Sequence, residues 1–177
     1  VSGMKLWILL MNTILEKLTS QRFFKDILLS VSFLTRIPIS KDLLFERNLM
    51  DAAWSFPLIG GLVGFLGGMV ALLLSYFNIS PIIISFITIG AIILLTGGLH
   101  EDGLADTADG FGINKNPEGK INIMRDSQIG VYGTLALIIA ISVKAVALSE
   151  LINKDPFFAC VIALIVSGAL SRSTIVG

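Results

Sequence analysis

Charged side chains are scarce in this sequence of 177 residues: they make up 15% of it, against 54% hydrophobic residues. In soluble domains about a quarter of all residues are charged, so this composition excludes an ordinary soluble domain. The 13 basic and 13 acidic side chains balance, which argues against a nucleic-acid partner. The single cysteine, Cys160, has no second cysteine with which to form an internal disulfide. Such a composition is typical of an integral membrane protein.

Apolar runs supply the candidate transmembrane helices, each of which needs about 20 residues. We expect one integral-membrane domain over residues 1–177, with spans near residues 54–77, 82–98, 131–148 and 156–176. Gly60, Gly64 and Gly68 share one face of the first span, where another helix can approach closely, either within the chain or in a homo-oligomer. The sequence thus predicts an all-α bundle of transmembrane helices.

Two shorter apolar runs near the N-terminus, residues 4–15 and 27–39, are too short to span a bilayer. We interpret them as interfacial or re-entrant helices. A further span or a signal peptide stays open as an alternative, although no small-residue cleavage site follows the first run.

Lysine and arginine are unevenly distributed and orient the spans. Seven of them precede residue 54, none lies in residues 78–81, and three lie in residues 99–130. Because basic residues accumulate on the cytoplasmic side, we expect the N-terminus and the acidic segment 99–130 to face the cytoplasm.

The run GLHEDGLADTADG, residues 98–110, follows an apolar run directly and contains the densest group of acidic residues. On a helix, Asp102, Asp106 and Asp109 share one stripe, where unpaired like charges repel each other. Hard carboxylate oxygens suit Mg²⁺, so we predict these three aspartates to be catalytic metal ligands. Glu101 is interpreted as a solvated neighbour. A solvated acidic loop is the alternative, but carboxylates next to a span usually mark function.

Other polar residues near the spans are candidates for the same site. His100 is a candidate catalytic acid or base, a phosphate contact, or only a hydrogen-bonding residue. Arg125 suits phosphate binding and Asp126 offers a further carboxylate, although an arginine here also suits a headgroup anchor. Lys144 and Arg172 are costly in lipid, so we expect them to face the bundle interior, where they neutralise a polyphosphate or pair with the aspartates.

Four pieces of the sequence together resemble the cobalamin (adenosylcobamide-phosphate) synthase family, also called adenosylcobinamide-GDP ribazoletransferase. They are FLTRIP at residues 33–38, FPLIG at residues 56–60, and the segments 97–110 and 124–133, in the family's order and spacing. The resemblance implies an integral inner-membrane enzyme that acts in the last steps of cobalamin (vitamin B12) biosynthesis. It implies Mg²⁺-dependent joining of adenosylcobinamide-GDP to α-ribazole, or to its 5′-phosphate, with release of GMP.

The resemblance also completes the set of expected partners and site residues. The candidate substrate-binding residues are Arg36, Arg125, Asp126, Ser127, Lys144 and Arg172. Membrane lipid and a homo-oligomer or a complex of the corrinoid pathway are the expected partners. Family members continue through further transmembrane helices, so we expect such helices either to follow residue 177 in a longer chain or to be supplied from elsewhere.

Three other functions fit parts of the pattern. A transporter of divalent cations or corrinoids would use the acidic cluster as a gate, but such proteins often have paired broken helices and this sequence has no second acidic stripe. A lipid-making phosphotransferase would show a different order of Asp, Gly, Ala and Arg. A non-catalytic scaffold of a membrane complex is the third.

Overall fold

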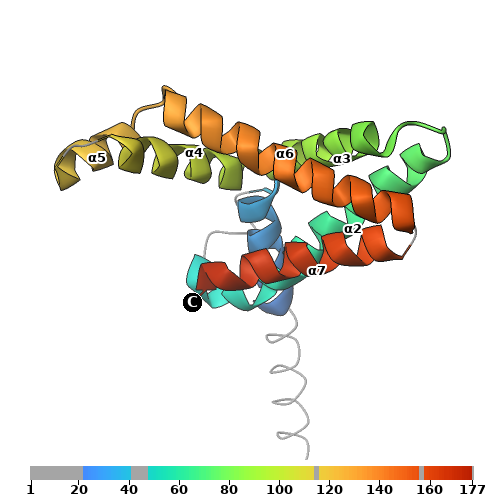
Figure 1. The fold of residues 1–177 in the computed structure, drawn as a ribbon. Helices are drawn as coiled ribbons and strands as arrows, with labels where there is room; N and C mark the ends of the chain where they lie inside the picture. Colours follow the sequence, from blue (N-terminus) through green and yellow to red (C-terminus); the bar gives the residue numbers. More distant parts are fainter. Residues whose placement is uncertain (1–21, 41–47, 114–115, 156–157, 177) are drawn as a thin grey trace, which may run out of the picture.

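The computed structural model describes residues 22–40, 48–113, 116–155 and 158–176, and these residues are mostly helical, with no strand among them. Residues 22–34 form a helix that precedes the elements labelled in Figure 1. The elements that follow are η2 (Leu49–Ser55), α2 (Phe56–Ser75), α3 (Pro81–Thr96), α4 (Leu99–Gly112), α5 (Pro117–Met124), α6 (Val131–Lys154), α7 (Ala159–Ser173) and η3 (Thr174–Val176). The predicted all-α fold class is confirmed. The predicted interfacial run at residues 4–15 lies outside the described residues.

The four predicted spans differ in whether the corresponding helices are long and apolar enough to cross a membrane. The continuous helix Leu49–Ser75 and helix α6 are long and apolar enough to cross a membrane. Helices α3 and α4 pass that test only as a pair, and the chain bends by 93° between them. Helix α7 is a shorter apolar helix of 15 residues. The long apolar helices indicate a membrane protein, and the number and orientation of the crossings stay predictions.

Two consecutive glycines cause the bend between α3 and α4. Gly97 and Gly98 both have a φ of 74°, a left-handed conformation that ends a helix and suits glycine because it has no Cβ. The side chain of Arg36 packs against Gly97, and the Arg36 N–H donates to the Leu95 carbonyl over 2.8 Å. The acidic helix α4 therefore begins at a sharp corner that the segment carrying Arg36 supports.

Close helix packing holds α2 against α7. Gly60 and Gly64 lie against the backbone of α7, and a Cβ at either would meet the carbonyl of Gly168 or of Leu164. Gly168 faces the Gly60 carbonyl in the same way. The small-residue face of the first span thus packs within the chain, which is one of the two uses that the sequence left open.

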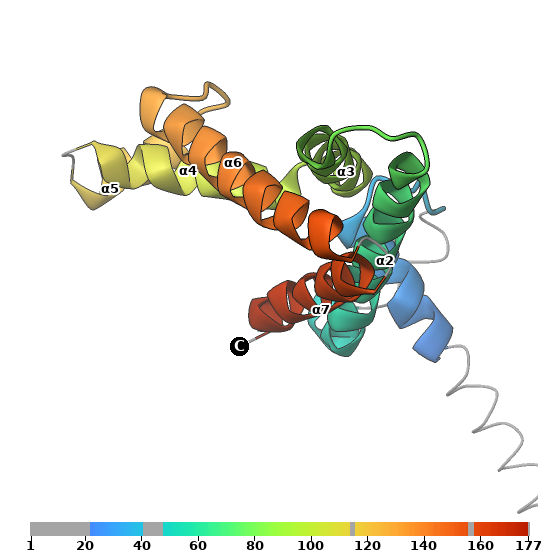
Figure 2. The ribbon, with the colours of Figure 1, turned by 45° about the vertical axis from the view of Figure 1, so that its right-hand side comes forward.

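Helices α6 and α7 meet at one end only. Helix α6 ends at Lys154 and α7 begins at Ala159, and the two helices diverge from these ends, so that α6 runs alongside α4 while α7 runs along α2 (Figures 1 and 2). Near the joined end a buried core of Ala71, Ile84, Ala145, Leu148 and Cys160 connects α2, α3, α6 and α7.

Candidate functional site

A cavity of about 750 Å³ lies at the corner between α3 and α4. We call it the acidic cavity. It is bounded by the segment of Phe33 and Arg36, the first two turns of α4, and the loop from Met124 to Ile129. Six of the predicted site residues line it: Arg36, Asp102, Asp106, Arg125, Asp126 and Ser127. Glu101 lines it as well, so the tertiary structure brings together four carboxylates and two guanidinium groups from three separate parts of the chain.

Helix geometry places the two aspartates of α4 in the acidic cavity. The helix starts at the glycine corner, where the Asp102 N–H donates to the Gly98 carbonyl over 2.8 Å. Asp106 follows one turn later on the same face, about 6 Å along the axis. Both side chains are at least partly accessible to solvent. Their carboxylates can therefore meet a ligand that enters the cavity.

Asp109 does not line the acidic cavity. Its carboxylate accepts hydrogen bonds from the backbone N–H groups of Gly130 and Gly133, over 2.7 and 2.9 Å, and the residue is 6% exposed. Asp109 lies on the same stripe as Asp102 but about 10 Å further along the helix axis. At that height the stripe faces the N-terminus of α6, where a carboxylate satisfies free N–H groups and the positive end of the helix dipole.

The structure does not bring the three predicted metal ligands together. Among the residues described here, no group of three His, Cys, Asp or Glu side chains is arranged to hold a metal ion. Mg²⁺ usually takes one or two protein carboxylates and completes its coordination with water and phosphate oxygens. One or two of the carboxylates of Asp102, Asp106 and Asp126, which line the same cavity, would supply that smaller protein contribution. Asp109 does not line this cavity, and both of its oxygens accept backbone hydrogen bonds at the start of α6.

A second cavity, of about 440 Å³, lies between α2, α3, α6 and α7, beyond the first turn of α4. We call it the inner cavity. His100, Lys144 and Arg172 line it and do not line the acidic cavity. Thr96 and Glu101 line both cavities and so form a shared wall. The predicted site is therefore divided between two adjoining spaces.

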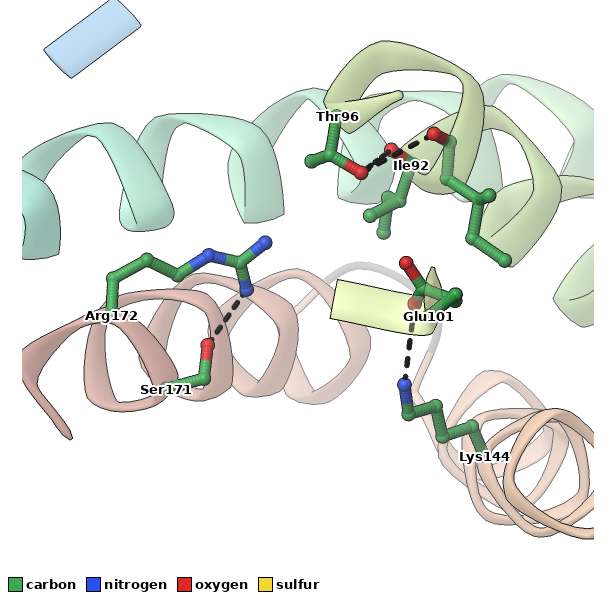
Figure 3. Close-up of polar contacts among 7 residues, drawn as sticks. Ile92, Thr96, Glu101, Lys144, Ser171 and Arg172 are labelled. Atoms are coloured by element: carbon green, nitrogen blue, oxygen red, sulfur yellow. Dashed lines mark hydrogen bonds and ion pairs between the residues drawn. The ribbon is translucent and has the colours of Figure 1, made fainter. Parts of the chain in front are cut away.

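Glu101 is more buried than its interpretation as a solvated neighbour implies. Its side chain is only 19% exposed, and Oε1 lies 3.7 Å from the Lys144 Nζ (Figure 3). Lys144 itself is 59% exposed, so it is less buried than expected, and its ion pair is with Glu101 rather than with an aspartate of the stripe. Because half of this pair is well solvated, it contributes little to stability.

His100 and Arg172 each bury a nitrogen that has no hydrogen-bond partner: Nδ1 of His100 and Nε of Arg172. The other end of the guanidinium donates from Nη1 to the Ser171 hydroxyl over 2.7 Å (Figure 3). The sequence had left open an ion pair between Arg172 and the aspartates. Within the described part of the chain, Arg172 makes no such pair.

Two features of the site were not predicted from the sequence. Gly130 and Gly133 leave room for the Asp109 carboxylate, which a Cβ at either position would strike. The shared wall of Glu101 and Thr96 was also unforeseen. The spacing of the two glycines in the segment 124–133 was a visible signal, but its meaning depends on a contact with α4 from more than twenty residues away.

Comparison with known proteins gives one consistent result. A family model described as cobalamin-5-phosphate synthase matches residues 26–177. Proteins named adenosylcobinamide-GDP ribazoletransferase are similar to the chain. The relative from Rhizobium etli (strain CIAT 652) is 38% identical over 148 residues, which is 82% of this chain and 57% of the relative. The relative from Brucella ovis is 39% identical over 150 residues, which is 84% of this chain and 58% of the relative. The relative from Sinorhizobium medicae is 38% identical over 159 residues, which is 88% of this chain and 60% of the relative.

The chain thus spans about three fifths of the length of these curated relatives. No solved structure gives a significant match.

Proposed function

The chain belongs to the cobalamin-5-phosphate synthase family, and from that membership we propose that it carries out the reaction for which its relatives are named. It joins adenosylcobinamide-GDP to α-ribazole, or to the 5′-phosphate of α-ribazole, and releases GMP. The observation that carries the proposal is the acidic cavity, where Asp102 and Asp106 lie opposite arginines from two other segments. Phosphoryl transfer needs such a combination of metal-binding carboxylates and phosphate-binding cations.

The reaction is a substitution at phosphorus. A hydroxyl oxygen of α-ribazole bonds to the phosphorus next to cobinamide, the bond from that phosphorus to the oxygen of GMP breaks, and the hydroxyl proton passes to a base. Negative charge grows on the phosphoryl oxygens and on the departing GMP. Arg36 and Arg125 bind those oxygens through their planar guanidinium groups.

We assign the metal to Asp102 and Asp106, with Asp126 as a further carboxylate. Mg²⁺, when bound, polarises the phosphoryl oxygens and stabilises the charge that develops on them. Whichever of the three aspartates Asp102, Asp106 and Asp126 is left without a bond to the metal accepts the hydroxyl proton. His100 is a weaker candidate for that role because it lines the inner cavity instead. The basic residues before residue 54 support an acidic cavity that faces the cytoplasm of the inner membrane.

The test measures GMP release from adenosylcobinamide-GDP and α-ribazole by membranes that contain the full-length protein. We expect release that depends on Mg²⁺ and is lost in Asp106→Asn. Glu150→Gln, on the exposed face of α6, is the matched control and should retain activity. A folded, membrane-inserted wild type that releases no GMP would refute the transferase. Uptake of corrinoid or divalent cation by the same membranes would then favour the transporter.

A further inference from the structure

The inner cavity has the size and lining of a small-molecule site. Its volume of about 440 Å³ falls in the range of roughly 300–1,000 Å³ that is usual for such sites. Most of its wall is aliphatic, and includes Val63, Ile89, Ile92, Leu148 and Leu164 from α2, α3, α6 and α7. Such a wall suits an apolar ring rather than a sugar or a phosphate.

The polar end of the cavity carries excess positive charge. Arg172 and Lys144 approach it from α7 and α6, and Glu101 supplies the one carboxylate of this lining (Figure 3). Lys144 is paired with Glu101, whereas Arg172 makes no ion pair in the part of the chain described here. The buried nitrogens of Arg172 and His100 lack partners. Buried polar groups without partners are rare in native proteins, and a ligand that accepts hydrogen bonds would satisfy them.

The position of the cavity connects it to the proposed reaction. Glu101 and Thr96 line both cavities, so a ligand that fills the inner one borders the space of Asp102 and Asp106. The proposed reaction has two substrates, and the proposed function assigns the phosphates of the donor to the acidic cavity. The second space is therefore available to the acceptor.

We propose that the inner cavity is the acceptor site, and that it takes a phosphorylated nucleoside with an apolar base. The base lies among the aliphatic side chains, and the phosphate accepts hydrogen bonds from Arg172 and His100 beside Lys144. The proposal rests on the proposed function, and its new element is Arg172 as the residue that favours α-ribazole 5′-phosphate over α-ribazole at this site. A phospholipid headgroup shares the same phosphate chemistry and is the competing source.

The test measures binding of the acceptor alone, without donor, to the full-length protein in detergent by calorimetry. We expect α-ribazole 5′-phosphate to bind at least about tenfold more tightly than α-ribazole. Arg172→Gln should weaken binding of the phosphorylated form by about 10- to 100-fold, the range of a charge-assisted hydrogen bond, and leave α-ribazole unaffected. Arg172→Lys should restore part of the affinity. Lys154→Gln, on an exposed cation at the far end of α6, is the matched control.

A second variant keeps the test decisive if Arg172→Gln does not fold. Ala147 lines the inner cavity yet is exposed, so Ala147→Phe fills the space from its open side and should weaken binding of both acceptors. Unchanged affinities in Arg172→Gln and Ala147→Phe would overturn the proposal. So would a phosphatidic acid that copurifies with the protein and that α-ribazole 5′-phosphate fails to displace.

The outcome is separable from that of the proposed function. If the wild type releases GMP but Arg172→Gln leaves the KM for α-ribazole 5′-phosphate unchanged, the acceptor site is wrong and the transferase stands. If acceptor binding depends on Arg172 but no GMP is released, the site stands and the transferase is wrong.

Discussion

Replacing Asp109 tests whether this residue joins two helices or binds metal. In the structure its two oxygens accept the N–H groups of Gly130 and Gly133 at the start of α6. Asp109→Ala leaves both donors without that acceptor and removes a negative charge from a helix N-terminus. Hydrogen bonds to a charged group contribute about 1.5–3 kcal/mol each, and the dipole interaction about 0.3–1 kcal/mol. Because such terms are not additive, we expect a loss of about 2–4 kcal/mol in the free energy of unfolding.

The conservative variant sharpens this prediction. In Asp109→Asn one oxygen remains, but the amide nitrogen must face the other backbone N–H, so two donors oppose each other. We expect it to lose about half as much stability as Asp109→Ala, roughly 1–2 kcal/mol. Asp106→Asn is the matched control: its side chain lines the acidic cavity, so it should lose activity with a change in stability below about 0.5 kcal/mol.

The assay combines denaturant unfolding in one detergent with titration of Mn²⁺ as a probe of the metal site. We expect Asp109→Asn to bind Mn²⁺ with nearly wild-type affinity and Asp106→Asn to bind it at least about tenfold more weakly. An Asp109→Ala protein of normal stability that no longer binds Mn²⁺ would refute this reasoning. It would restore the three-aspartate metal site that the sequence predicted.

Three further predictions concern packing, charge and metal. Gly168→Ala should destabilise the protein by about 1–3 kcal/mol, because the new Cβ would strike the backbone of α2. Gly90→Ala should stabilise the protein by roughly 0.5–1 kcal/mol, because Gly90 lies in a helix with open space around it. Thermal unfolding of the two variants in one detergent checks this, and equal effects would contradict the close packing of α2 and α7. Lys144→Gln should change the free energy of unfolding by less than about 1 kcal/mol, since the Lys144 side chain of this ion pair is well solvated, and a greater loss in the same assay would show a stronger pair. Removal of divalent cations with EDTA should reduce GMP release to background, and added Mg²⁺ should restore it; release that survives EDTA would exclude the metal.

Local properties of the chain were predictable from the sequence because they depend on neighbouring residues. The length of each apolar run predicted helices at residues 54–77 and 131–148, and long apolar helices lie there. The spacing of Asp102, Asp106 and Asp109 predicted a shared helical stripe, since 3.6 residues per turn follows from backbone geometry alone. The resemblance in four short segments predicted the family, which the comparison confirms.

The tertiary structure decided which aspartates of that stripe line the acidic cavity and which one bonds to another helix. Periodicity gives the direction in which a side chain points, but not what lies opposite at each height along the axis. Asp102 and Asp106 face the open corner made by Gly97 and Gly98, whereas Asp109, about 10 Å further on, meets the N-terminus of α6.

The same distinction explains the second cavity. Sequence could indicate only that Lys144 and Arg172 avoid lipid, because an isolated charge in an apolar run must find water or a partner. It could not show that His100 joins them in a space apart from the aspartates. That arrangement follows from α6 and α7, which meet at one end and diverge at the other (Figure 1). The angle between two helices depends on packing between residues distant in the chain, which no local pattern records.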